Sequence, residues 1–99
     1  MIIYKIQNNI NNKCYIGKTI FDSIWERYHC NKNHKDIIKR HHNKQLKYDF
    51  EKYGFNNFSF EIICTCYDYN ELTELEKFYI NKYNSFNNGY NDTLGGDGR

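Results

Sequence analysis

Glu76 is a carboxylate placed where a helical pattern calls for an apolar residue. Leu72, Leu75 and Tyr79 recur at the spacing of one helix face. At about 100° per residue, Glu76 falls about 40° from Leu72 and therefore inside that face. Burial of an unpaired carboxylate is costly, so Glu76 is predicted to be a metal ligand or an acid/base. The alternative is a boundary residue whose carboxylate reaches water or pairs with a lysine.

Arg27 has a comparable position in an earlier segment. Ser23 and Glu26 form a capping box, which predicts a helix that begins near Ser23. Within this helix Arg27 shares a face with Ile24 and Tyr28. Either the aliphatic part of the Arg27 side chain covers aromatic surface, or its guanidinium group directs its N–H donors at a carboxylate or phosphate. Both uses stay open.

Tyr4 and Tyr15 lie in short β-type runs, residues 2–6 and 14–16, that flank an Asn-rich connector. The runs predict a β-hairpin. One position of the turn would place Tyr4 directly opposite Tyr15, and a later turn would shift the register. Gly17 follows the second run, and a residue without Cβ lets a ligand approach the backbone. The alternative is that both tyrosines are half-buried strand residues.

The remaining elements must position these groups. Apolar spacing predicts a helix over 46–53 that stops at Gly54, and alternation predicts a strand over 58–63. The helix that carries Glu76 comes last. Asp68 with Glu71 predicts its start, and its apolar stripe is expected to continue to Tyr83. The order β-β-α-α-β-α predicts an α/β fold, a small three-stranded antiparallel β-sheet flanked by three helices. A single domain is expected over 1–96, with a flexible tail at 97–99.

Composition restricts the class of protein. The chain has 99 residues, 18% of them aromatic, and a mean hydropathy of −0.92. No apolar run approaches the ~20 residues of a membrane span, and the start lacks the form of a signal peptide. An intracellular protein, cytoplasmic or nuclear, is expected, neither secreted nor in a membrane. Four cysteines in no framework spacing indicate free thiols, with a zinc site as the weaker alternative.

Charge is distributed unevenly although the net charge is only +2. Segment 32–47 carries six Lys or Arg residues and three histidines against a single Asp36. Segment 68–76 carries four acidic residues and no basic one. A basic stripe beside an acidic helix fits nucleic-acid binding on one side of the domain. A solvated surface is the alternative.

In this order, these residues resemble the GIY-YIG nuclease domain. The resemblance rests on Tyr4, on Tyr15-Ile16-Gly17, on Arg27 and on Glu76, and it extends from Ile2 to about Gly96. Further matching stretches are Lys52-Tyr53-Gly54, Asn57-Phe58, Leu75-Glu76-Lys77-Phe78-Tyr79-Ile80, Gly89-Tyr90-Asn91 and Gly95-Gly96.

The resemblance implies metal-dependent hydrolysis of DNA phosphodiester bonds. Glu76 is then expected to hold a single Mg²⁺ or Mn²⁺, a cation that keeps several waters and stabilises charge on the scissile phosphate. Tyr4 or Tyr15 would orient or deprotonate the attacking water, and Arg27 would neutralise phosphoryl charge. Asn91 would brace the site by hydrogen bonding.

Histidine and DNA contacts follow from the same resemblance. His41 or His42 matches a polar site position, and His41 is taken as the catalytic candidate. Asn31 stands where the family commonly has a His or Tyr, and an amide cannot act as a general base. The expected DNA-binding residues are Gly17, Lys18, Lys39, Arg40, Lys44 and Asn91.

The sequence therefore predicts a metal-dependent endonuclease that nicks or cuts DNA, with RNA as the less expected substrate. No helix-turn-helix or zinc finger specifies a target, so targeting is expected to need a partner protein, dimerisation or residues beyond this chain. One alternative is a catalytically inactive nucleic-acid-binding module of the same fold. The other is a structural or partner-docking domain that uses the acidic helix.

Overall fold

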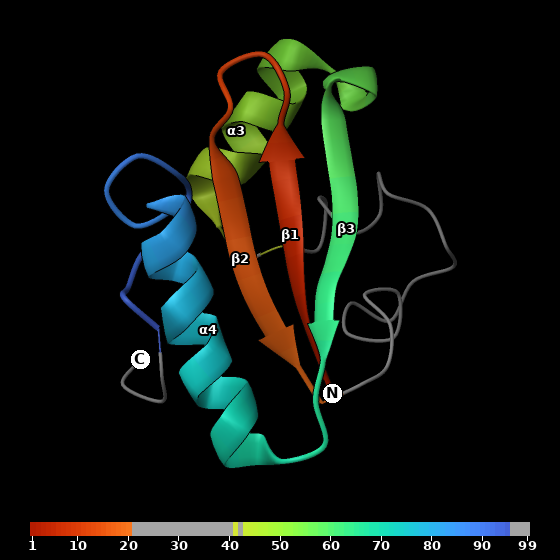
Figure 1. Ribbon diagram of the computed structural model, residues 1–99. Helices are drawn as coiled ribbons and strands as arrows, with labels where there is room; N and C mark the ends of the chain where they lie inside the picture. Colours follow the sequence, from red (N-terminus) through yellow and green to blue (C-terminus); the bar gives the residue numbers. More distant parts are fainter. Residues whose placement is uncertain (21–40, 42, 96–99) are drawn as a thin grey trace.

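An antiparallel β-sheet of three strands forms the centre of the computed structural model (Figure 1). The structure describes residues 1–20, 41 and 43–95. Strand order is β2-β1-β3, so the first strand of the chain is the central one. The described elements are β1 (Ile2–Asn8), β2 (Cys14–Thr19), α3 (Lys44–Tyr53), the 3₁₀ turn η1 (Phe55–Asn57), β3 (Phe58–Thr65) and α4 (Tyr69–Tyr83).

The register of the hairpin places Tyr4 opposite Gly17 and Ile6 opposite Tyr15. The direct pairing of Tyr4 with Tyr15, one of the two predicted registers, is therefore wrong. The two tyrosines are diagonal neighbours on the same face, with ring centroids 6.3 Å apart. Diagonal pairs in antiparallel strands remain within reach of aromatic side chains.

Asparagines build the turn that sets this register. Asn8 donates its N–H to the carbonyl of Lys13 at 2.8 Å, and its side-chain oxygen accepts from the N–H of Ile10 at 2.9 Å. Asn12 has a φ of 64°, a left-handed conformation that asparagine tolerates better than most residues. The turn therefore follows from side-chain to backbone bonding that the Asn-rich connector supplies.

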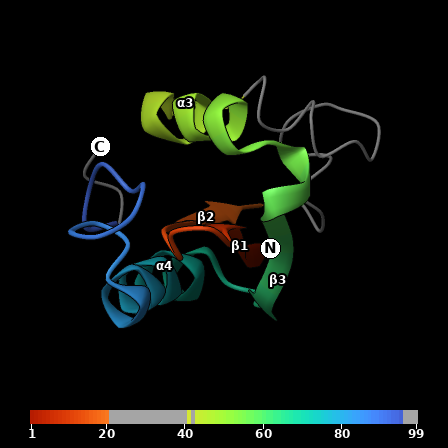
Figure 2. The ribbon, with the colours of Figure 1, turned by 90° about the horizontal axis from the view of Figure 1, so that it is seen from above.

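Two helices cover opposite faces of the sheet, which makes three layers (Figure 2). Each face has its own apolar cluster. The cluster on the α3 side contains Ile2, Tyr4, Ile6, Leu46, Phe58 and Tyr90. The cluster on the α4 side contains Ile3, Cys14, Ile16, Cys66, Leu72 and Ile80. Alternate residues of β1 enter different clusters because successive strand side chains point to opposite faces.

Both described helices begin and end close to the predicted positions. The side chain of Asp68 accepts from the N–H of Glu71 at 3.1 Å, which caps α4 as predicted. α3 stops before Gly54, whose N–H bonds to the carbonyl of Phe50 at 2.9 Å. The predicted stripe of α4 needs one correction, because Ile80 is buried whereas Tyr83 is exposed.

The predicted α/β fold with a three-stranded antiparallel sheet is confirmed, and so are its last two helices. The helix predicted to begin at Ser23 and the tail at 97–99 lie outside the described residues. In the part of the chain that the structure describes, no helix is long and apolar enough to cross a membrane.

Gly17 is required because the ring of Tyr4 occupies the space beside it. A Cβ on Gly17 would lie within 2.8 Å of three atoms of the Tyr4 side chain. Gly17 is not among the described residues with positive φ, so the requirement is steric and not conformational. The prediction that its missing Cβ admits a ligand needs correction, since the protein's own phenol fills that space.

Gly17→Ala is expected to destabilise the domain by about 1–3 kcal/mol, because overpacking displaces the Tyr4 ring. Urea unfolding of Gly17→Ala, Tyr4→Leu and the double variant measures this coupling. The cost of Gly17→Ala should fall in the Tyr4→Leu background. An equal cost in both backgrounds would contradict the proposed clash.

Candidate functional site

Tyr4, Tyr15 and His41 lie together on the α3 side of the sheet. The rings of Tyr15 and His41 are perpendicular, with centroids 4.5 Å apart, and Tyr4 follows at 6.3 Å from Tyr15. Tyr4 is 1% exposed and His41 2% exposed, whereas Tyr15 is half-buried. Of the two phenols, Tyr15 therefore has the better access to a substrate.

Glu76 and Lys18 meet on the opposite face. Glu76 is 8% exposed on α4, and the ammonium nitrogen of Lys18 lies 3.8 Å from its Oε1 atom. Lys18 directly follows Gly17, so its side chain points away from the Tyr4 face and toward α4. The sequence-based placement of Glu76 on the buried face agrees with this burial.

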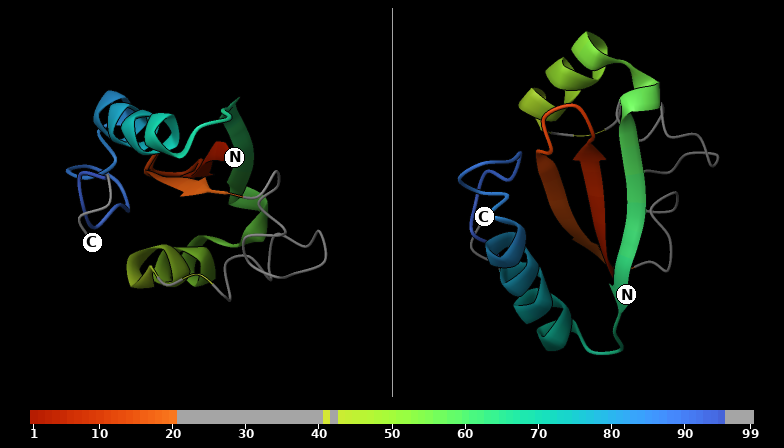
Figure 3. Two further views of the ribbon diagram at one scale, coloured as in Figure 1. Left: turned by 90° about the horizontal axis from the view of Figure 1, so that it is seen from below. Right: turned by 45° about the horizontal axis from the view of Figure 1, so that its top comes forward.

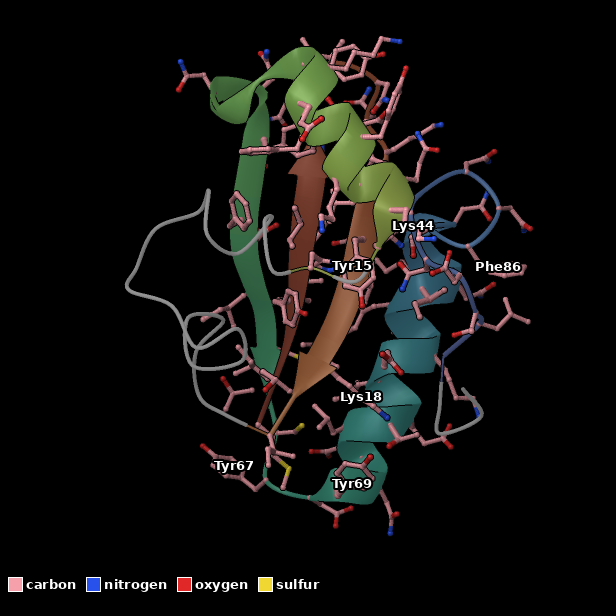
Figure 4. All side chains as sticks on the ribbon, turned by 180° about the vertical axis from the view of Figure 1, so that it is seen from behind. Tyr15, Lys18, Lys44, Tyr67, Tyr69 and Phe86 are labelled. Carbon is pink, nitrogen blue, oxygen red and sulfur yellow. The ribbon has the colours of Figure 1, made fainter. Side chains whose placement is uncertain are left out.

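Further α4 side chains hold the ammonium group of Lys18. Its nitrogen lies 3.2 Å from the hydroxyl oxygen of Thr73 and 5.2 Å from the centroid of the Tyr69 ring. Figure 4 shows Lys18 directed over α4, with Tyr69 near the start of that helix. A positive charge fixed at a partly buried carboxylate interacts more strongly than it would in water.

Residues 89–91, here called the closing segment, cover the outer edge of β2. The N–H of Tyr90 donates to the carbonyl of Cys14 at 2.9 Å. The amide of Asn91 accepts from the N–H of Ile16 and donates to its carbonyl, both at 2.8 Å. A Cβ on Gly89 would lie 2.5 Å from the Cys14 carbonyl oxygen. The edge strand thereby gains partners for backbone groups that an open edge leaves unpaired.

Tyr90 connects the closing segment to β1 and α3. Its hydroxyl donates to Oδ2 of Asp49 at 2.7 Å and accepts from the side chain of Asn8 at 3.1 Å. Burial raises the pKa of the Tyr90 phenol well above its ordinary value, and the hydrogen bond to Asp49 acts in the same direction. Tyr90 therefore stays protonated and remains a donor to Asp49.

Asn43 belongs to the same hydrogen-bond network as Tyr90, and the sequence analysis missed it. Its side-chain oxygen caps α3 by accepting from the N–H of Leu46 at 2.9 Å, and its amide donates to the carbonyl of Tyr90. Its own N–H donates to Nδ1 of His41 at 3.0 Å. An asparagine three residues before the first apolar helix position is an N-cap signal that could have found it.

Asp49 and Asn8 were missed as well. Asp49 is 4% exposed on α3 and also accepts from the side chain of Gln45 at 3.0 Å. Asn8 is fully buried at the end of β1. Asp49 belongs to no local motif, and Asn8 was marked only as part of the Asn-rich turn, so no sequence signal placed either residue in this network.

The predicted residues thus form two groups around β2. The phenols and imidazole lie on one face, and the carboxylate and ammonium lie on the other. Figure 3 shows the chain that follows α4, which includes the closing segment, on the β2 side of the sheet, between the two helical layers. Tyr15 and Lys18 belong to the same edge strand, so β2 connects the two groups.

A hard divalent cation fits this donor set. Among the described residues, no three His, Cys, Asp or Glu side chains cluster as a metal site. One near-buried carboxylate suits Mg²⁺ or Mn²⁺, which commonly keep water ligands and use few protein ligands. Cys14, Cys64 and Cys66 are free thiols, as expected. Cys30 and two histidines of the zinc alternative lie outside the described residues.

The other predicted DNA contacts divide by position. Lys44 is exposed at the first residue of α3 (Figure 4). Both ends of the Asn91 amide bond to the backbone of Ile16, consistent with the bracing role expected of it. Arg27, Lys39 and Arg40 lie outside the described residues.

Comparisons with known proteins agree with one another. The family model described as the GIY-YIG catalytic domain matches residues 1–91. A solved structure of the catalytic domain of the homing endonuclease I-TevI has 35% sequence identity and a TM-score of 0.73. The match covers 92% of this chain and 96% of that one.

Two proteins of enterobacteria phage T4 are also similar. Intron-associated endonuclease 1 is 37% identical over 92 residues, which cover 90% of this chain and 35% of that protein. Putative endonuclease segB is 34% identical over 96 residues, which cover 96% of this chain and 38% of that protein. The chain thus spans little more than a third of the length of these relatives.

Asn91→Ala is expected to lower stability by about 1–3 kcal/mol for each Ile16 backbone group that it leaves buried and unpaired. Amide hydrogen exchange at Ile16 should accelerate. Asn87→Ala is the matched control, because within the described part of the chain that amide bonds to exposed Asn84 at 3.2 Å. Unchanged protection of Ile16 in Asn91→Ala would contradict the assigned pairing.

Proposed function

The chain belongs to the GIY-YIG catalytic domain family, and we propose that it hydrolyses DNA phosphodiester bonds. The family and the class of enzyme predicted from the motifs, a GIY-YIG endonuclease and thus a hydrolase, are confirmed. The observation that carries the proposal for this chain is Glu76. It is a near-buried carboxylate beside Lys18, on the face of β2 opposite the two phenols.

Tyr15 is the phenol proposed to orient or deprotonate the attacking water. Tyr4 is buried and packed against Gly17. It is therefore better placed to support the Tyr15 ring than to contact the attacking water. A phenol has an ordinary pKa of about 10, so a basic tyrosine needs positive charge nearby. Arg27, as inferred from the sequence, is the proposed source of that charge.

Glu76 is the proposed ligand of Mg²⁺ or Mn²⁺. Nucleases of this family are generally metal-dependent. When bound, the cation would supply positive charge at the scissile phosphate and at the leaving oxygen. Lys18 balances the Glu76 carboxylate in the described arrangement, and its ammonium can donate to a phosphate oxygen at the same edge.

DNA is the proposed substrate because of the relationship to intron endonucleases. Lys18, Lys44 and, from the sequence alone, Lys39 and Arg40 supply the proposed phosphate contacts. These contacts are few, so binding should be weak, salt-sensitive and poor at reading sequence. Target choice is therefore assigned to a partner protein, a second copy or residues beyond this chain.

Glu76→Gln is expected to lower metal-dependent nicking of supercoiled plasmid by at least about 100-fold, because it removes the carboxylate that would hold the cation. Glu74→Gln is the matched control on α4. Glu74 is exposed and pairs with Lys77 at 3.5 Å, so its variant should keep nearly full activity. Both variants are assayed with Mg²⁺ or Mn²⁺, with and without EDTA.

The same assay separates the alternatives. Nicking that survives Glu76→Gln would remove the metal role of this residue. Plasmid binding without cleavage by the wild-type protein would indicate a catalytically inactive nucleic-acid-binding module. Absence of both binding and cleavage would favour a docking domain.

A further inference from the structure

We propose that His41 is a positioning residue for Tyr15 that stays neutral, with its ring proton on Nε2, and transfers no proton in the reaction. The proposal rests on the proposed function, because Tyr15 matters only if it acts on the attacking water. Three observations at the start of α3 carry it. They are a hydrogen bond, the position of the ring relative to the helix, and its contact with Tyr15.

The hydrogen bond fixes the tautomer. The N–H of Asn43 donates to Nδ1 of His41 at 3.0 Å, and a ring nitrogen that accepts a hydrogen bond carries no proton. In the neutral imidazole the proton must then lie on Nε2. Protonation of Nδ1 would set two N–H donors against each other. His41 therefore has no free basic nitrogen at Nδ1 and no lone pair at Nε2.

The position of the ring disfavours the imidazolium form. Asn43 is the N-cap of α3, so His41 stands two residues before it, at the positive end of the helix dipole. The side chain is 2% exposed, and burial removes the solvation that a charged ring needs. The positive end of the helix dipole disfavours a positive charge on an adjacent ring, so it favours the neutral imidazole.

Contact with Tyr15 gives the ring its role. The two rings are perpendicular with centroids 4.5 Å apart, and Tyr4 lies 6.3 Å from Tyr15. Perpendicular aromatic contacts at this distance are favourable and restrict the orientation of both rings. His41 is too deeply buried to meet a substrate itself, so it acts through the half-buried Tyr15.

Nitrogen NMR of protein labelled with ¹⁵N-histidine tests the protonation state directly. At neutral pH, the His41 signal should show the neutral form with the proton on Nε2. The spectrum of His41→Gln identifies which of the 4 histidine signals belongs to His41. A signal from the Nδ1–H tautomer or from imidazolium would overturn the proposal. This readout does not depend on cleavage activity.

Plasmid nicking by two His41 variants tests whether His41 positions Tyr15 or transfers a proton. His41→Phe keeps a ring against Tyr15 but cannot ionise, so its nicking rate should stay within about tenfold of the wild-type rate. The nicking rate of His41→Ala, which has no ring, should be at least about tenfold lower than that of His41→Phe. A residue that transfers a proton in the reaction contributes about 10²–10⁴-fold to the rate. A loss of at least 100-fold in folded His41→Phe, equal to that of His41→Ala, would overturn the proposal.

Circular dichroism confirms that each variant is folded. If His41→Phe does not fold, because the Asn43 N–H loses its acceptor, the nitrogen spectrum of the wild-type protein still tests the neutral tautomer. A wild-type protein that neither binds nor nicks DNA would defeat the proposed function. The nitrogen spectrum would still decide whether His41 is neutral.

Discussion

The pairing of the Asn91 amide with the backbone of Ile16 is the constraint on which the rest of the site depends. One side chain satisfies both the N–H and the carbonyl of a residue on the outer edge of β2, each at 2.8 Å. An unpaired edge can fray or slip, and a slip of one residue would exchange its two faces. Tyr15 and Lys18 would then each point into the wrong layer.

Strand β2 carries candidate site residues on both of its faces, so the candidate site needs both helical layers. Tyr15 faces the layer of α3, where Asn43 caps the helix and bonds to His41 and Tyr90. Lys18 faces α4, where it lies 3.8 Å from Glu76. The closing segment bonds to β2 and, through Tyr90, to Asp49 of α3. Displacement of either helix would therefore disturb the groups on β2.

Local features of the fold could be predicted from the sequence, and the long-range contacts could not. Helical periodicity placed Glu76 on the buried face of α4, and Asp68 marked the start of that helix, because both signals lie within a few residues. The pairing of Asn91 with Ile16 joins residues 75 apart in the chain, and no local pattern encodes it. The hairpin register stayed open between two turn positions for a related reason, since side-chain and backbone bonds of the asparagines decide where the turn falls.

Tyr15 and Glu76 are proposed to serve one site at the edge of β2. Paramagnetic broadening by Mn²⁺ tests it most directly, because the effect falls off steeply with distance from the ion. Titration of the ¹⁵N- and ¹³C-labelled protein should broaden signals of Lys18, Glu76 and the Tyr15 ring together, and Glu76→Gln should abolish all three effects. Broadening that spares Tyr15, or that persists in Glu76→Gln, would contradict a single site.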